Sequence, residues 1–156
     1  MLSLQPEIRN TVRAVIIRQQ QLLLLKKEQD GMGVCYALPG GAQETGETLR
    51  EALIRECREE IGCTIKLQDI LHVADYFKYK PLPQPSTRHQ LEILFQCDVP
   101  ESYRPQNGPK PDKHQIAVVW IDLQELDRYR LSPQGIAPLL ENLGQNEQAV
   151  YAEAID

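Results

Sequence analysis

The sequence predicts one domain of the α/β or α+β sandwich type, with β-strands on both sides of a single strong helix. The chain of 156 residues has the size of one ordinary domain, large enough to bury a hydrophobic core. Runs rich in β-branched residues and leucine occur before and after residues 48–61, which themselves carry helix start and stop signals. Because no internal repeat or long linker divides the sequence, we expect one domain over residues 1–156.

A hairpin opens the predicted fold. Residues 11–18 and 21–26 are rich in β-branched residues or leucine, and the short gap between them is typical of a tight turn. A glycine-containing loop follows at residues 30–33. The apolar run at residues 34–38 then meets a Pro-Gly-Gly sequence at residues 39–41, which ends a strand and permits unusual backbone angles. We therefore expect the chain to turn sharply there.

Residues 48–61 are the strongest helix prediction. Thr48 has the side chain of an N-cap residue, and Glu51 stands three positions later, as in a capping box. Gly62 stands where a helix commonly ends in a left-handed conformation. These signals predict both ends of the helix.

The remainder of the chain predicts further strands, two exposed loops and a terminal helix. The strand predictions rest on a high content of β-forming residues, and the loops are rich in proline or polar residues. The predicted strands are residues 64–79, 89–99 and 116–121, the loops are residues 81–85 and 103–113, and the helix is residues 133–143, with a bend at Pro138.

Composition limits the classes of partner. The chain is 42% hydrophobic and 25% charged, as in soluble globular proteins, and its net charge is −5. A nucleic acid polymer would meet an unfavourable average field, so we exclude it as a partner. A small anionic substrate remains compatible with this charge, because a bound divalent cation reverses the local field.

The cysteines and the N-terminus indicate a reduced, cytoplasmic protein. The four cysteines contain no CxxC pair, and the three histidines do not stand at zinc-ligand spacings from them. Residues 1–9 lack the basic and apolar segments of a secretory signal, and no run approaches the roughly 20 apolar residues of a membrane span. We expect no membrane partner, and a homodimer is compatible with the sequence.

Three glutamates of the predicted helix lie at the edge of its apolar face. At about 100° per residue, Leu49 and Leu53 define an apolar arc, and Glu60 projects between their directions. Glu56 lies beside this arc and Glu59 borders it. Solvent-facing carboxylates belong on the opposite side of such a helix.

Two interpretations of these carboxylates are open. In the first, they are surface charges neutralised by Arg55 and Arg58. This interpretation accounts for Glu51, which stands four residues before Arg55 and can pair with it on the helix surface. The other three glutamates repel one another at spacings of three and four residues and would be desolvated beside apolar side chains. A hard divalent cation with oxygen ligands removes both costs. Geometry therefore favours a metal site. The bare backbone of residues 39–41 adds space for a phosphate and a carbonyl ligand.

The spacing of these residues resembles a Nudix box. Gly41 is followed after five residues by Glu47, and after seven more by the run Arg55-Glu56-Cys57-Arg58-Glu59-Glu60-Ile61-Gly62-Cys63. Cys57 and Cys63 replace the usual branched aliphatic residues and are expected to act as small buried hydrophobes. The resemblance extends weakly to residues 38–41 and 120–123, which places the domain core at about residues 10–143.

The resemblance implies a fold, an activity and a set of roles. The fold is an α/β/α sandwich with a mixed β-sheet, and the activity is hydrolysis of a nucleoside diphosphate linked to another group. The cofactor is Mg²⁺ or Mn²⁺. Arg55 would orient Glu56, and Glu47 would hold Arg55. The implied metal ligands are Glu56, Glu59, Glu60 and the carbonyl of Gly40.

One departure concerns the general base. Many relatives carry a glutamate before the strand that contains the tryptophan, whereas this chain has Gln115, which cannot accept a proton. Glu56 is then the leading candidate for the base, and Asp112 is the second.

The substrate is predicted only as a class. We expect a small nucleotide-like molecule, and ADP-ribose and other sugar nucleotides, nucleoside triphosphates and dinucleoside polyphosphates all stay open. Gly41, Tyr79 and Arg88 are candidate substrate-binding residues, although an exposed tyrosine or arginine also serves packing or solubility. Two alternatives are a Nudix-like domain that binds a nucleotide without hydrolysis and a purely structural domain.

Overall fold

The computed structural model describes residues 8–31, 33–81, 83–141, 143 and 149–156. Most of the N-terminal segment used above, residues 1–7, and residue 142 of the predicted last helix lie outside this range. The strands are β1 (Ile8–Arg18), β2 (Gln21–Gln29), β3 (Gly33–Ala37), β4 (Gly40–Ala42), β5 (Lys66–Lys80), β6 (Ser86–Asp98), β7 (Gln115–Asp122) and β8 (Tyr151–Ile155). The helices are α1 (Leu49–Ile61), α2 (Ala137–Glu141) and two 3₁₀ helices, η1 (Leu123–Arg128) and η2 (Gln134–Ile136).

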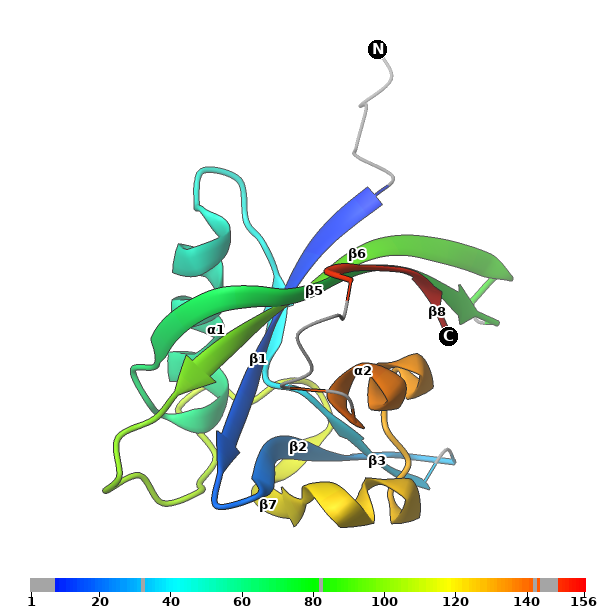
Figure 1. Cartoon of the computed structure of the whole chain (residues 1–156). Coiled ribbons are helices and arrows are strands. Elements are labelled where there is room, and N and C mark those ends of the chain that lie inside the picture. The colour runs from blue at the N-terminus through cyan, green and yellow to red at the C-terminus, as the bar shows by residue number, and fades with distance from the viewer. Residues whose placement is uncertain (1–7, 32, 82, 142, 144–148) are drawn as a thin grey trace.

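Strand β1 is the centre of a mixed sheet (Figure 1). It runs parallel to β6 over nine paired positions and antiparallel to β4 over three. Its last residues form the predicted hairpin with β2, which continues to β3 and β7. On the other side, β6 pairs with β5, and β5 pairs with β8. The connection between the parallel strands β1 and β6 is long and includes β2, β3, β4, α1 and β5.

Helical elements cover both faces of this sheet. Leu53 and Cys57 of α1 pack with Val12 of β1 and Phe95 of β6 in one buried cluster. The other face is covered by η1, η2 and α2, and Figure 1 shows α1 and α2 on opposite sides of β1. Alternation along the strands puts successive side chains in the two clusters. The expected α/β/α sandwich with a mixed sheet is confirmed.

Helix α1 has the predicted ends. The Thr48 side chain accepts a hydrogen bond from the Glu51 backbone N–H, and the Glu51 carboxylate accepts one from the Thr48 N–H, so the capping box is complete. Gly62 ends the helix at φ 68°, in the left-handed region. Cys57 and Cys63 are buried, as expected of small hydrophobes, and all four cysteines carry free thiols.

The predicted helix at residues 133–143 is wrong as one element. The chain forms η2 and then the five-residue α2, because the Gly135 N–H donates to the carbonyl of Asp156 instead of continuing an α-helix. Strands β4 and β8 and helix η1 were not predicted, since each is short and β8 is held by long-range pairing. Within the described residues, the helices are all too short or too polar to cross a bilayer.

Candidate active site

The guanidinium of Arg55 joins the loop before α1 to the helix. Its Nε and Nη2 donate to the two oxygens of Glu47 at 3.0 and 2.7 Å, and Nη2 also donates to the carbonyl of Ala42 at 3.1 Å. Its Nη1 donates to Oε1 of Glu56 at 3.0 Å. The hydrogen bond from Arg55 holds the pKa of Glu47 below its usual value, and the same bond raises the pKa of Arg55. Arg55 therefore fixes the position of the Glu56 carboxylate.

Glu60 is a buried carboxylate. Only 2% of this residue is exposed, and its Oε1 accepts a hydrogen bond from the backbone N–H of Gly40 at 2.8 Å. Burial raises its pKa to about 8, with further contributions from the negative charges of Asp112 and Glu56. Its position on the apolar side of α1 is the one expected from the helical spacing. A buried carboxylate of this kind is stabilised by a cation that contacts its other oxygen.

Glycine is required at both positions of the turn before α1. A Cβ on Gly41 would lie 2.6 Å from the carboxyl carbon of Glu56, so only a glycine lets this carboxylate lie against the backbone. At Gly40, φ is 143° and a Cβ would lie 1.9 Å from the carbonyl oxygen of Val12. The close approach of β4 to β1 and α1 thus depends on these two residues.

The carboxylate oxygens of Glu56, Glu59 and Glu60 are the type of ligand that a hard cation prefers. Glu56 and Glu59 each turn an oxygen to Arg55, at 3.0 and 3.5 Å from Nη1. In this conformation, no three acidic, cysteine or histidine side chains of the described residues form an enclosing metal cluster. Burial raises the pKa of Glu56, and the negative charge of Glu56 adds to the raised pKa of Glu60, so the site gathers oxygen donors that repel one another. Glu56 and Glu59 meet at Arg55, Glu60 contacts the backbone of Gly40, and the role of these residues as metal ligands stays a prediction.

Gln115 has a structural position that the sequence did not reveal. Its Nε2 donates to the backbone carbonyl of Glu60 at 2.8 Å and to Oδ1 of Asn107 at 2.9 Å, and its Oε1 accepts from the Asp112 N–H. The carbonyl of Glu60 also accepts from the Gly108 N–H. These bonds satisfy a carbonyl in the last turn of α1 and attach the loop before β7 to the helix. Asp112 itself forms a 2.7 Å ion pair with Lys27 of β2.

A cleft of about 320 Å³ lies between β3, β5 and the segment after η1. Its lining includes Cys35, Tyr76, Lys78, Tyr79 and Arg130. Burial lowers the pKa of Lys78, and the nearby positive charges of Lys80, Lys27, Arg13 and Arg88 lower it further. Lys78 and Arg130 give the cleft a cationic wall, and Asp156 adds a carboxylate to its lining. Tyr79, one of the predicted substrate-binding residues, lines it, whereas Arg88 is near this wall and does not line the cleft.

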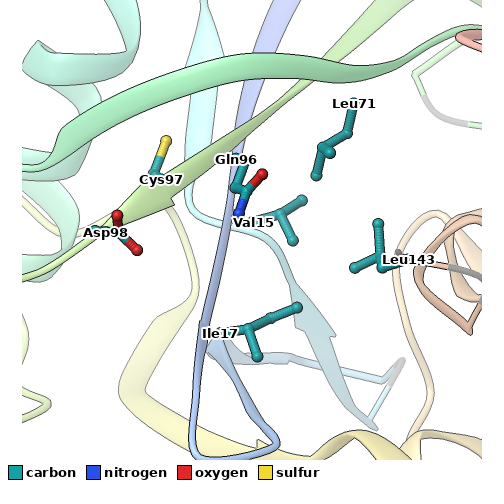
Figure 2. A pocket seen from close by; sticks show the side chains of 7 residues that line it. All are labelled: Val15, Ile17, Leu71, Gln96, Cys97, Asp98 and Leu143. Carbon is teal, nitrogen blue, oxygen red and sulfur yellow. The ribbon is translucent and has the colours of Figure 1, made fainter. Parts of the chain in front are cut away.

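A second cavity of about 170 Å³ lies beside the ends of β1 and β6 (Figure 2). Val15, Ile17, Leu71 and Leu143 provide most of its wall, together with Gln96, Cys97 and Asp98. None of the described residues that line this cavity is basic, so its described wall offers no cationic group to phosphates.

Comparison with known proteins decides the family. The sequence model of the NUDIX domain matches residues 7–143, which include the glycine turn, α1 and the strands up to β7. The chain belongs to the Nudix family. The resemblance of residues 41–63 to a Nudix box is therefore confirmed.

Two relatives of this Nudix protein carry names of pyrophosphate-cleaving enzymes. The CTP pyrophosphohydrolase of Escherichia coli is 31% identical over 132 residues, which cover 83% of this chain and 87% of the relative. The ADP-ribose pyrophosphatase of Methanocaldococcus jannaschii is 35% identical over 88 residues, which cover 56% of this chain. The aligned region spans 49% of the length of that second relative.

Solved structures support the same architecture. A MutT NUDIX hydrolase from Burkholderia pseudomallei has a TM-score of 0.64 at 26% identity and covers 87% of this Nudix chain and 98% of its own. A NUDIX hydrolase from Nitrosomonas europaea has a TM-score of 0.68 at 18% identity, covers 94% of this chain and 77% of its own, and shows the fold alone.

We expect the stability of the cation-free protein to depend on pH through Glu60. Its folded pKa of about 8 lies above the ordinary value of 4.5, so the folded state retains a proton that the unfolded chain has lost. The contribution of Glu60 to stability is therefore present at acid pH and is lost as the pH rises from about 4.5 to about 8. Mg²⁺ should raise the melting temperature most at pH 8, and a cation at 100 times its dissociation constant contributes about 2.7 kcal/mol.

Thermal melts at pH 5, 6, 7 and 8, each with EDTA or with Mg²⁺, measure this linkage. Glu60→Gln is the control, because it keeps the side-chain size and removes the titration. If the melts at pH 8 coincide with and without Mg²⁺, the free protein does not bind the cation.

We expect Gln115→Ala to lower stability and to leave turnover per folded molecule nearly unchanged. The substitution removes the hydrogen bond to the Glu60 carbonyl in the last turn of α1 and the bonds to Asn107 and Asp112, each of which contributes about 0.5–1.5 kcal/mol. Denaturant unfolding and steady-state turnover separate the two effects. A large loss of turnover in the folded variant would assign a catalytic role to this loop.

Proposed function

We propose that this Nudix protein hydrolyses a phosphoanhydride bond in a nucleoside diphosphate linked to another group, with the help of Mg²⁺ or Mn²⁺. The observation that supports it most is the Arg55 guanidinium, which joins Glu47 to Glu56 at hydrogen-bonding distance. This contact holds Glu56 beside Glu59 and Glu60, against a backbone turn without side chains. An ordinary surface helix has no need of such an arrangement.

The cation would be held by the carboxylates of Glu56, Glu59 and Glu60 and by the carbonyl of Gly40. When bound, it supplies Lewis-acid stabilisation of the phosphate charge and lowers the pKa of water. The protein supplies three of these donors from one helix, and the contact of Glu56 with Arg55 orients one of them before substrate binds.

Glu56 is the proposed general base. Burial raises its pKa above the ordinary value, and its contact with Arg55 fixes its orientation. Asp112 is less suited, because its carboxylate is already engaged by the Lys27 ammonium at 2.7 Å. Arg55 and Glu47 act by positioning Glu56.

The proposed substrate spans the carboxylates and the cationic cleft. The names of the relatives favour nucleoside triphosphates and ADP-ribose as first candidates. Tyr79 is 63% exposed at the cleft, which leaves its ring free to stack on a base, and Arg88 lies near enough to add positive charge. Gly41 lets the phosphates approach the backbone. The free thiols accord with the expected cytoplasmic location.

We expect Glu59→Gln and Glu60→Gln each to lower turnover by about 100-fold or more while the fold remains intact. Each substitution keeps the side-chain size and removes one anionic oxygen donor. The measurement is phosphate or nucleotide release from a panel of ADP-ribose, sugar nucleotides, nucleoside triphosphates and dinucleoside polyphosphates, with Mg²⁺ or Mn²⁺.

Glu51→Gln is the matched control on the same helix. Glutamine retains the capping-box contact, so this variant should keep its turnover. Near-normal turnover in both test variants would refute the metal assignment. Nucleotide binding without hydrolysis by the unmodified protein would instead indicate a catalytically silent domain.

A further inference from the structure

Arg13 and Glu92 form a buried ion pair inside the mixed sheet. Arg13 lies on β1 and Glu92 on the adjacent β6, and Nε of Arg13 is 3.0 Å from Oε2 of Glu92. The Glu92 side chain is fully buried, whereas 17% of the Arg13 side chain is exposed. Each charged residue stands near buried apolar residues of its strand, Val12 and Ala14 on β1 and Leu94 on β6. Neither was singled out from the sequence, although a charge within an apolar strand is a detectable signal.

Both oxygens of Glu92 are occupied by donors. Oε2 accepts from Arg13, and Oε1 accepts from Nε2 of Gln90 at 3.3 Å. Nε2 of Gln90 also lies 3.5 Å from the hydroxyl of Thr11. Glu92 is therefore fixed on both sides, so it is poorly placed to bind a metal ion or to accept a proton.

Arg13 connects the carboxylates of α1 with the cationic cleft. It pairs in register with Gly40 of β4, and the backbone N–H of Gly40 donates to Glu60. Its charge acts on Glu60, and it also acts on Tyr76 and Lys78, which line the cleft. Arg13 thus lies between the two parts of the proposed substrate site.

Stability alone gives a weak reason for this pair. Two buried charges lose their hydration, and their attraction often does no more than offset that loss. The contact with Glu92 uses Nε, and the described residues provide no hydrogen-bond partner for the two terminal nitrogens of Arg13. A guanidinium held in this way presents a planar pair of donors that matches two oxygens of a phosphate.

We propose that the terminal nitrogens of Arg13 bind the diphosphate of the substrate, and that Glu92 is a positioning residue that orients Arg13 through Nε. This inference rests on the proposed function, because it assigns the residue that receives the diphosphate beside the α1 carboxylates. Gln90 assists by holding the second oxygen of Glu92.

The test compares Arg13→Lys with the unmodified protein. Lysine keeps the positive charge and loses the planar pair of donors, so the dissociation constant for ADP in the presence of Mg²⁺ should rise by about 10-fold to 100-fold. Calorimetric titration measures this constant without any need for hydrolysis. With the best substrate of the panel, KM should rise by a similar factor. Arg18→Lys is the control, because Arg18 lies on the same strand and donates to backbone carbonyls far along the chain, including that of Tyr103.

Glu92 is tested by two substitutions. Glu92→Gln retains an oxygen acceptor for Nε and should keep the affinity for ADP near that of the unmodified protein. Glu92→Leu removes the acceptor and should weaken ADP binding and raise KM, with a smaller effect on kcat. Equal affinities in these two variants would overturn the positioning role.

A double variant provides a second test if Arg13→Lys does not fold. Arg13→Met combined with Glu92→Leu removes both charges and keeps a similar side-chain volume. ADP affinity within twofold of the unmodified protein, in whichever of these variants folds, would overturn the proposal. Failure of both to fold would also overturn it, since the pair would then be a structural requirement. If ADP binding depends on Arg13 but the unmodified protein hydrolyses no substrate, the proposed function is refuted. The role of Arg13 in diphosphate binding is then retained.

Discussion

The hydrogen bonds of the Arg55 guanidinium are the interaction on which the site depends. One planar group contacts Glu47 through two nitrogens, the carbonyl of Ala42, and Glu56. It therefore fixes the loop after β4 and a catalytic candidate on α1 at the same time. The fork of donors supplies this geometry, which a lysine would not reproduce. The glycine turn allows it, because a side chain at Gly41 would displace the Glu56 carboxylate.

The rest of the architecture explains why the site can carry an unfavourable concentration of charge. Helix α1 is fixed by its capping box, by a buried apolar face against β1 and β6, and by hydrogen bonds from the loop before β7 to its last turn. These contacts can offset the cost of the buried Glu60 carboxylate and of the crowded Glu56. The carboxylates of the site are thus held in an ordered arrangement, which would suit a cation-binding centre.

Local signals allowed the site and much of the fold to be predicted from the sequence. The capping box at Thr48, the left-handed Gly62 and the periodic burial of Glu60 each depend on residues close in sequence. The pairing of β8 with β5, the hydrogen bonds of Gln115 and the contact of Arg13 with Glu92 join distant segments. Their partners are defined only by the three-dimensional fold, and a single sequence does not encode the pairing in any local pattern.

The most direct measurement of the central claim is the turnover of Arg55→Lys, with Arg58→Lys as the control from the same helix. Arg58 contacts the side chain of Thr64 at the exposed end of α1 and does not touch the carboxylates in the described contacts. If Arg55 positions Glu56, the Arg55→Lys variant should fold and lose turnover by about 100-fold, as expected for a misplaced reacting group. The Arg58→Lys control should retain its turnover. Turnover of folded Arg55→Lys within twofold of the unmodified protein would contradict the account.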